Sequence, residues 1–131
     1  MAKILVIDDD SAVRSTIGRI LQRKGYQVVF AENGLRGVAV FHEERPDLVI
    51  TDMIMPGLDG VETIRAILRE RPDAKIIAAS GGGRVGNTDF LGMAREVGAC
   101  DTISKPADPS EIISRVRRWI DAPEAAGSPS A

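Results

Sequence analysis

The sequence has one cysteine, few aromatic residues and no long apolar run. Cys100 has no second cysteine with which to form an intrachain disulfide, which is consistent with a reducing compartment. No apolar stretch approaches the roughly 20 residues of a membrane-spanning helix. The apolar run near the N-terminus, residues 4–7, is followed at once by acids and does not resemble a signal peptide. We therefore expect a soluble, cytoplasmic protein with no membrane partner.

A large net charge is also lacking. The 17 basic and 19 acidic residues give a net charge of −2, so the overall charge offers no reason to expect nucleic acid as a direct partner. The chain of 131 residues is 44% hydrophobic, which predicts one domain with one core over residues 1–121. Residues 122–131 are rich in Ala, Pro, Gly and Ser, and we expect a disordered tail or a truncated linker there.

Short apolar runs alternate with segments of helical periodicity five times along the chain. This alternation predicts an α/β fold, a doubly wound parallel sheet with helices on both faces. The expected strands are residues 4–7, 27–30, 47–51, 75–79 and 100–104. The expected helices run from Ser11 to before Gly25, from about Leu35 to Glu44, from Val61 to about Leu68, from about Thr88 to Val97 and from about Pro109 to Ile120.

Three adjacent acids, Asp8, Asp9 and Asp10, follow the first expected strand. Two like charges about 4 Å apart repel by roughly 4 kcal/mol at an effective dielectric constant of about 20. Asp10 is explained as a helix N-cap, a position that favours aspartate. The repulsion between the other two acids must be offset by a cation, a shared proton or solvent.

The later strands end in further polar residues: Asp52 after the third, Ser80 after the fourth and Lys105 after the fifth. Ligands of open α/β sheets bind beyond the carboxyl ends of the strands, where the strand order reverses. Carboxylates from two strands suit Mg²⁺. Metal, lysine, hydroxyl and backbone N–H groups are the parts that phosphoryl transfer requires, and a carboxylate can itself become an aspartyl phosphate.

The motifs together resemble the receiver domain of two-component response regulators, over about residues 3–121. The resemblance rests on Ile4-Leu5-Val6-Ile7-Asp8-Asp9-Asp10, Ala31-Glu32-Asn33-Gly34, residues 47–60 (DLVITDMIMPGLDG), Ser80-Gly81 and Lys105-Pro106. It implies a flavodoxin-like fold with five strands in the order 2-1-3-4-5 and five helices. It also implies a phosphoprotein that acts as a signalling switch and is not an enzyme, beyond assisting its own phosphorylation and dephosphorylation.

The resemblance assigns roles to particular residues. Asp52 would accept a phosphoryl group from a sensor histidine kinase or a phosphotransfer protein. Mg²⁺ would be bound by Asp9, Asp52 and the carbonyl of Ile54, with Asp8 acting largely through water. Ser80 and the N–H of Gly81 would bind the phosphoryl oxygens, and Lys105 would pair with them through a cis Lys105–Pro106 bond. The signal would pass to a downstream target protein through helix four, strand five and helix five, from a monomer or a phosphorylation-dependent dimer.

Two departures from the family pattern concern the switch. Thr102 stands where the family usually has an aromatic residue, so the usual coupling between hydroxyl and aromatic side chain is in doubt. The segment from Ser80 to Lys105 is about three residues longer than usual, and the glycines at 81–83 and 86 account for it. We therefore hypothesise that activation orders this loop and helix four. Amide exchange over residues 81–97 that did not respond to a phosphoryl mimic would contradict this hypothesis.

Other functions remain open from the sequence. The chain could be a fragment of a longer regulator with an output domain, or a pseudo-receiver that binds partners without phosphorylation. Asp8-Asp9-Asp10 also fits the start of haloacid-dehalogenase-type phosphatases, in which Asp8 would be the nucleophile. No acidic pair follows Lys105 to complete that site. Ile54, beside the expected phosphoryl group, would hinder attack by water and lengthen the phosphorylated lifetime.

Overall fold

The computed structural model describes residues 2–55, 58–81, 84–85 and 88–120, and its centre is a five-stranded parallel sheet. The strands are β1 (Lys3–Ile7), β2 (Gln27–Ala31), β3 (Leu48–Asp52), β4 (Ile76–Gly81) and β7 (Asp101–Lys105). Their order is β2-β1-β3-β4-β7, which confirms the predicted fold class and strand order. The expected tail at 122–131 lies outside the described residues.

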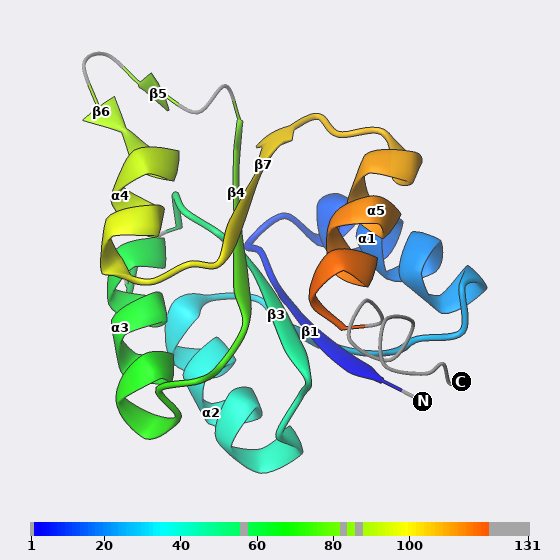
Figure 1. The fold of residues 1–131 in the computed structure, drawn as a ribbon, viewed down its shortest axis with the longest axis horizontal. Helices are drawn as coiled ribbons and strands as arrows, with labels where there is room; N and C mark the ends of the chain where they lie inside the picture. Colours follow the sequence, from blue (N-terminus) through cyan, green and yellow to red (C-terminus); the bar gives the residue numbers. More distant parts are fainter. Residues whose placement is uncertain (1, 56–57, 82–83, 86–87, 121–131) are drawn as a thin grey trace.

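Five helices cover the two faces of this sheet (Figure 1). Helices α2 (Gly34–Glu44), α3 (Gly60–Glu70) and α4 (Phe90–Val97) lie on one face, and α1 (Ser11–Arg23) and α5 (Pro109–Trp119) lie on the other. Alternate residues of a strand point to opposite faces. Leu5 and Ile7 therefore join the core beneath α2, α3 and α4, and Ile4 and Val6 join the core beneath α1 and α5.

Caps place the helix ends where the sequence predicts them. The Asp10 side chain accepts hydrogen bonds from the backbone N–H groups of Ala12 and Val13, at 2.9 and 3.3 Å, and so caps α1. Asp59 caps α3 in the same way. Gly25 and Gly98 follow α1 and α4 with φ of 93° and 120°, a conformation that favours glycine.

The segment between β4 and α4 differs from the expected pattern. The strands β5 (Arg84–Val85) and β6 (Thr88–Asp89) form an antiparallel pair outside the main sheet, above α4 in Figure 1. Helix four, expected from about Thr88 to Val97, is confirmed but begins two residues later, at Phe90, because Thr88 pairs with Val85. Gly82, Gly83 and Gly86, to which we attributed the extra length, lie outside the described residues, and the proposed ordering on activation stays a prediction.

Strand ends shift by a residue or two. Ser80 and Lys105, expected beyond their strands, lie inside β4 and β7, because the pairing of these strands continues to Gly81 and Lys105. Cys100 precedes β7, although its N–H donates to the carbonyl of Ile76 at 2.8 Å.

Candidate functional site

The carboxyl ends of β1 and β3 bring three acids together. Ile7 and Thr51 are paired in register, so Asp8 and Asp52 follow at the same edge of the sheet. One carboxylate oxygen from each of Asp8, Asp9 and Asp52 lies within 4.8 Å of the others. Asp8 and Asp52 are buried and Asp9 is exposed, so the cluster is anchored in the protein and open on one side.

Asp8 is held by three neighbours. One carboxylate oxygen accepts the backbone N–H of Asp10 at 2.9 Å, and the other accepts from the Lys105 ammonium at 2.9 Å. The Arg14 guanidinium donates to the carbonyl oxygen of Asp8 at 2.7 Å. Arg14 lies on the first turn of α1 and reaches back to the end of β1. These contacts fix the orientation of Asp8, which is buried, whereas the neighbouring Asp9 is exposed.

Lys105 connects the two buried acids. Its ammonium nitrogen lies 2.9 Å from Asp8 and 3.4 Å from Asp52. Burial by itself lowers the pKa of Lys105, but the hydrogen bond to Asp8 and the charge of Asp52 outweigh it, and the pKa lies above its ordinary value. Lys105 is therefore a permanent positive charge at this edge. The Lys105–Pro106 bond is cis, as the resemblance implies.

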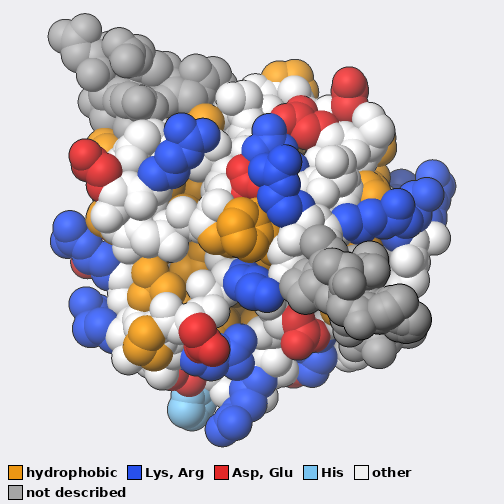
Figure 2. Space-filling view, viewed as in Figure 1, with side chains coloured by type: hydrophobic (Ala, Val, Ile, Leu, Met, Phe, Trp, Pro, Cys, Tyr) orange, Lys and Arg blue, Asp and Glu red, His pale blue; other side chains and the backbone are white. Residues whose placement is uncertain are grey.

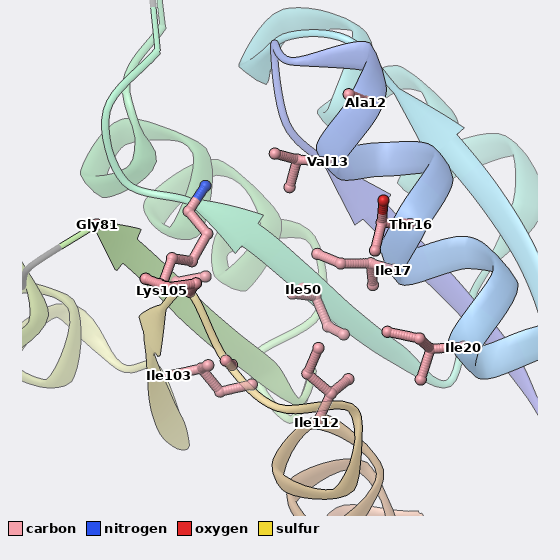
Figure 3. A pocket seen from close by; sticks show the side chains of 13 residues that line it. Ala12, Val13, Thr16, Ile17, Ile20, Ile50, Gly81, Ile103, Lys105 and Ile112 are labelled. Carbon is pink, nitrogen blue, oxygen red and sulfur yellow. The ribbon is translucent and has the colours of Figure 1, made fainter.

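The stem of Lys105 borders an apolar cavity of about 470 Å³ between α1, the sheet and the β7–α5 segment. Figure 3 shows Ile50, Ile103 and Ile112 around this cavity, whereas the amine of Lys105 points away from them. The methylene stem of Lys105 thus lies against apolar side chains, and its ammonium lies at the acids. Packing of the stem helps to hold the ammonium there.

Asp52 is 7% exposed and lies at the last position of β3. Its carboxylate accepts the backbone N–H of Met53 at 2.9 Å. Burial raises the pKa of Asp52; the charge of Lys105 lowers it, the charge of Asp8 raises it again, and the net pKa lies above its ordinary value. A second cation beside Asp52 would favour its charged form.

The donor set fits a hard divalent cation. Three carboxylates from two strand ends supply oxygen ligands, and the exposed side of the cluster leaves room for the water that Mg²⁺ keeps. One lysine does not neutralise three carboxylates, so the remaining charge favours a cation. Asp8, Asp9 and Asp52 are therefore the residues that could hold magnesium.

Ser80 supplies a hydroxyl with no acceptor in the described part of the chain. Its oxygen is fully buried and makes no hydrogen bond. Asp52 is in register with Ala79, so Ser80 is the next residue of β4 at the same edge. A Cβ atom added at Gly81 would meet nothing within 4 Å, so the backbone there is open to a ligand.

Ile54 and Thr102 are the remaining predicted residues; the backbone N–H of Ile54 hydrogen-bonds to the Asp52 carboxylate, whereas Thr102 lies away from the acids. The Ile54 side chain, in the segment after β3, is 45% exposed. Thr102 is buried on β7 in register with Ala78, two residues before Ser80 on the neighbouring strand. Its hydroxyl accepts a hydrogen bond from Arg95 of α4. Thr102 therefore contacts the helix of the expected output face and not the acids.

Comparison with known proteins identifies the family. The family model of the response regulator receiver domain matches residues 4–117. The chain belongs to this family. Sporulation initiation phosphotransferase F of Bacillus subtilis is 32% identical over 118 residues, which cover 90% of this chain and 93% of that protein. A crystal structure of a response regulator receiver domain protein from Clostridium thermocellum superposes with a TM-score of 0.86 at 31% identity, covering 96% of this chain and 99% of that one.

Receiver domains also occur in longer relatives. The probable transcriptional regulator ycf27 of Pyropia yezoensis is 38% identical over 115 residues, which are 88% of this chain and 46% of that protein. This receiver thus spans about half the length of several curated relatives and nearly all of others. None of the helices in its described residues is long and apolar enough to cross a membrane.

Proposed function

We propose that this receiver is a phosphorylation switch in which Asp52 is the phosphoacceptor. The observation that carries the proposal is the position of Asp52, which is buried, 3.4 Å from the Lys105 ammonium and within 4.8 Å of the oxygens of Asp8 and Asp9. A carboxylate oxygen of Asp52 attacks the phosphorus of a phosphohistidine on a kinase or phosphotransfer protein. The P–N bond breaks, and the imidazole nitrogen keeps the electron pair and takes up a proton.

The neighbouring residues prepare Asp52 for this step. Asp8, Asp9, Asp52 and the carbonyl of Ile54 would hold Mg²⁺, which when bound neutralises charge on the phosphoryl oxygens. Lys105 provides a further positive charge beside Asp52. The Ser80 hydroxyl and the N–H of Gly81 are donors to a phosphoryl oxygen, which would give the buried Ser80 hydroxyl the partner that it lacks among the described residues.

The phosphorylated state would be recognised by a downstream protein. A phosphoryl group adds about 1.5 to 2 negative charges. To shift two conformations from 1:99 to 99:1 it must bind one of them about 5.5 kcal/mol more tightly. We assign the output face to α4, β7 and α5, where the Arg95–Thr102 contact lies. Output by a monomer and output by a phosphorylation-dependent dimer are both consistent with this face.

A second arrangement is supported by the longer relatives. The chain matches about half of ycf27 and of transcriptional regulatory protein ResD from Bacillus subtilis. In this second proposal the receiver is the regulatory part of a longer regulator with an output domain. The phosphoacceptor chemistry is the same in both arrangements.

Intact mass spectrometry tests the phosphoacceptor. The wild type, Asp52→Ala and Asp73→Asn are incubated with Mg²⁺ and a small-molecule phosphodonor. Asp73 is a matched control because its side chain is 91% exposed and lies outside the acid cluster. We expect one phosphoryl adduct on the wild type and on Asp73→Asn, and none on Asp52→Ala.

Fragmentation of the labelled protein separates the alternatives. A label on Asp8 would favour a haloacid-dehalogenase-type phosphatase. An equal adduct on Asp52→Ala would refute the assignment of Asp52. The absence of any adduct, from the phosphodonor and from a phosphorylated phosphotransfer protein alike, would favour a pseudo-receiver.

A further inference from the structure

The two helices on one face of the sheet are strongly basic, although the protein as a whole is weakly acidic. Within α1 and α5 the basic residues are Arg14, Arg19, Arg23, Arg115, Arg117 and Arg118, and Lys24 follows α1 directly. Glu111 is the one acid within these two helices. Since the net charge of the chain is −2, this face has a positive potential that the overall composition conceals.

Five of these seven basic residues fall into two groups. Arg115 and Arg118 pair with the buried Asp101, and their charge is balanced within the protein. Arg23, Lys24 and Arg117 form no ion pair with any acid in the described residues. The second group consists of solvated like charges that an anionic ligand would neutralise.

These three residues border one groove between the end of α1 and α5. The groove has a volume of about 680 Å³, within the range of small-molecule sites. The hydroxyls of Ser110 and Ser114 lie along the α5 side of this groove. None of its lining residues belongs to the acid cluster of the phosphoacceptor site.

The floor of the groove is apolar. Ile20 of α1 and Ile113 of α5 line it, and Ile113 is 7% exposed. Figure 2 shows Lys and Arg side chains at the right edge of the molecule, on the side where Figure 1 places α1 and α5. The groove therefore combines an apolar surface with cations and hydroxyl-bearing residues at its border, a combination suited to a ligand with a planar apolar part and several anionic oxygens.

We propose that this groove binds a nucleoside di- or triphosphate. Planar guanidinium groups match phosphate geometry through paired N–H donors, and Arg23 and Arg117 offer such groups from two helices. Ser110 and Ser114 add hydroxyl donors, and the base packs on Ile20 and Ile113. An acidic peptide would satisfy the charges but would make no particular use of the apolar floor formed by Ile20 and Ile113.

Calorimetric titration with ATP, AMP, inorganic tripolyphosphate and an acidic peptide tests the proposal. EDTA is present, so that the acid cluster binds no divalent ion. The test variant is Arg23→Gln/Arg117→Gln. The matched control is Arg36→Gln/Arg69→Gln, which removes the same charge from exposed positions of α2 and α3. Should the test variant not fold, Ser110→Ala/Ser114→Ala, at two exposed positions, takes its place.

We expect saturable binding of ATP to the wild type and the control, at least tenfold weaker binding to the test variant, and weaker binding of AMP and tripolyphosphate than of ATP. Four outcomes would overturn the proposal: no saturable ATP binding to the wild type, an equal loss in both double variants, tripolyphosphate binding as tightly as ATP, or binding of an acidic peptide without binding of ATP. The double variants are also labelled with the phosphodonor, so a failure of the phosphoacceptor proposal is recognised separately.

Discussion

Arg95 of α4 donates a hydrogen bond of 2.8 Å to the hydroxyl of Thr102 on β7. Thr102 is 6% exposed, whereas Arg95 lies at the protein surface. The family resemblance places an aromatic side chain at the position of Thr102. In this receiver the strand is instead connected to α4 by a polar contact, and α4 buries only one residue completely, Ala94.

Removal of this contact is expected to destabilise the protein. Thr102→Val leaves the shape nearly unchanged and removes the acceptor, which should lower the free energy of unfolding by about 1 kcal/mol. A double-mutant cycle with Arg95→Met, measured by urea denaturation, isolates the pair. A coupling energy near zero would show that the hydrogen bond does not hold α4 on the sheet.

Asp101 anchors α5 to the beginning of β7. Its carboxylate accepts hydrogen bonds from the Trp119 indole N–H at 2.9 Å, from the Thr102 N–H at 2.8 Å and from Arg115. Burial alone raises the pKa of Asp101, but these three donors outweigh it and the pKa lies below its ordinary value. Asp101→Asn should lower the free energy of unfolding by about 2 kcal/mol at neutral pH.

The sign of the shift determines the pH dependence. Because the folded pKa of Asp101 is lowered, its contribution is fully present above the unfolded value of about 3.9 and is lost as the pH falls through the folded value. Urea denaturation should therefore show a constant difference between wild type and Asp101→Asn down to about pH 5 and a smaller one below about pH 3.9. Glu111→Gln, the exposed partner of Arg115, should change stability by less than about 0.5 kcal/mol. A difference in the free energy of unfolding between wild type and Asp101→Asn that grows as the pH falls would contradict the role assigned to Asp101.

Gly60 is required where α3 begins beside the phosphoacceptor. A Cβ atom there would lie 2.5 Å from the Cα of Met53 and 2.8 Å from the carbonyl oxygen of Asp52. Gly60→Ala should therefore destabilise the protein by about 1 to 3 kcal/mol and slow labelling by the phosphodonor, since backbone must move. At Gly18 a Cβ would meet only the edge of the half-exposed Phe30 ring, so Gly18→Ala is the control. Wild-type stability and labelling of Gly60→Ala would refute this reading.

Asp9 and Asp10 are adjacent acids with different expected roles. Asp9→Asn should weaken Mg²⁺ binding by at least about tenfold, because it removes an oxygen ligand. Asp10→Asn removes the same charge but keeps a side chain that caps α1, and it should bind Mg²⁺ nearly as the wild type does. Calorimetric titration with Mg²⁺ measures both. Equal losses of Mg²⁺ affinity in the two variants would mean that charge alone, and not ligation, determines the affinity.

Ile54 is expected to lengthen the phosphorylated lifetime. Its exposed apolar side chain follows the phosphoacceptor by two residues, where it would hinder water from reaching Asp52. Ile54→Asn should speed the loss of the phosphoryl group severalfold, followed by intact mass after removal of the donor. Leu35→Asn, at a position that is 69% exposed on α2, is the control. Identical decay in Ile54→Asn and wild type would refute the role.

The elements and the acids of the site could be predicted because their signals are local. The apolar run before Asp8 identifies a buried strand, and the cap at Asp10 identifies a helix start. The β5–β6 pair could not be predicted, because two-residue strands have no periodicity. The roles of Arg14 and Asp101 were also missed, since an arginine on a helix and an acid at a strand start have the same local sequence whether solvated or paired.

By itself the sequence determined the alternation of strands and helices and the presence of acids, hydroxyl and lysine at strand ends, because periodicity and chain order alone fix these features. Only the tertiary structure decided which of these groups meet. Lys105 reaches Asp8 across 97 positions of sequence, and Thr102 meets Arg95 and not the acids. The physical reason is that ion pairs and hydrogen bonds depend on distances of about 3 Å, which only the packing of the sheet and its helices sets.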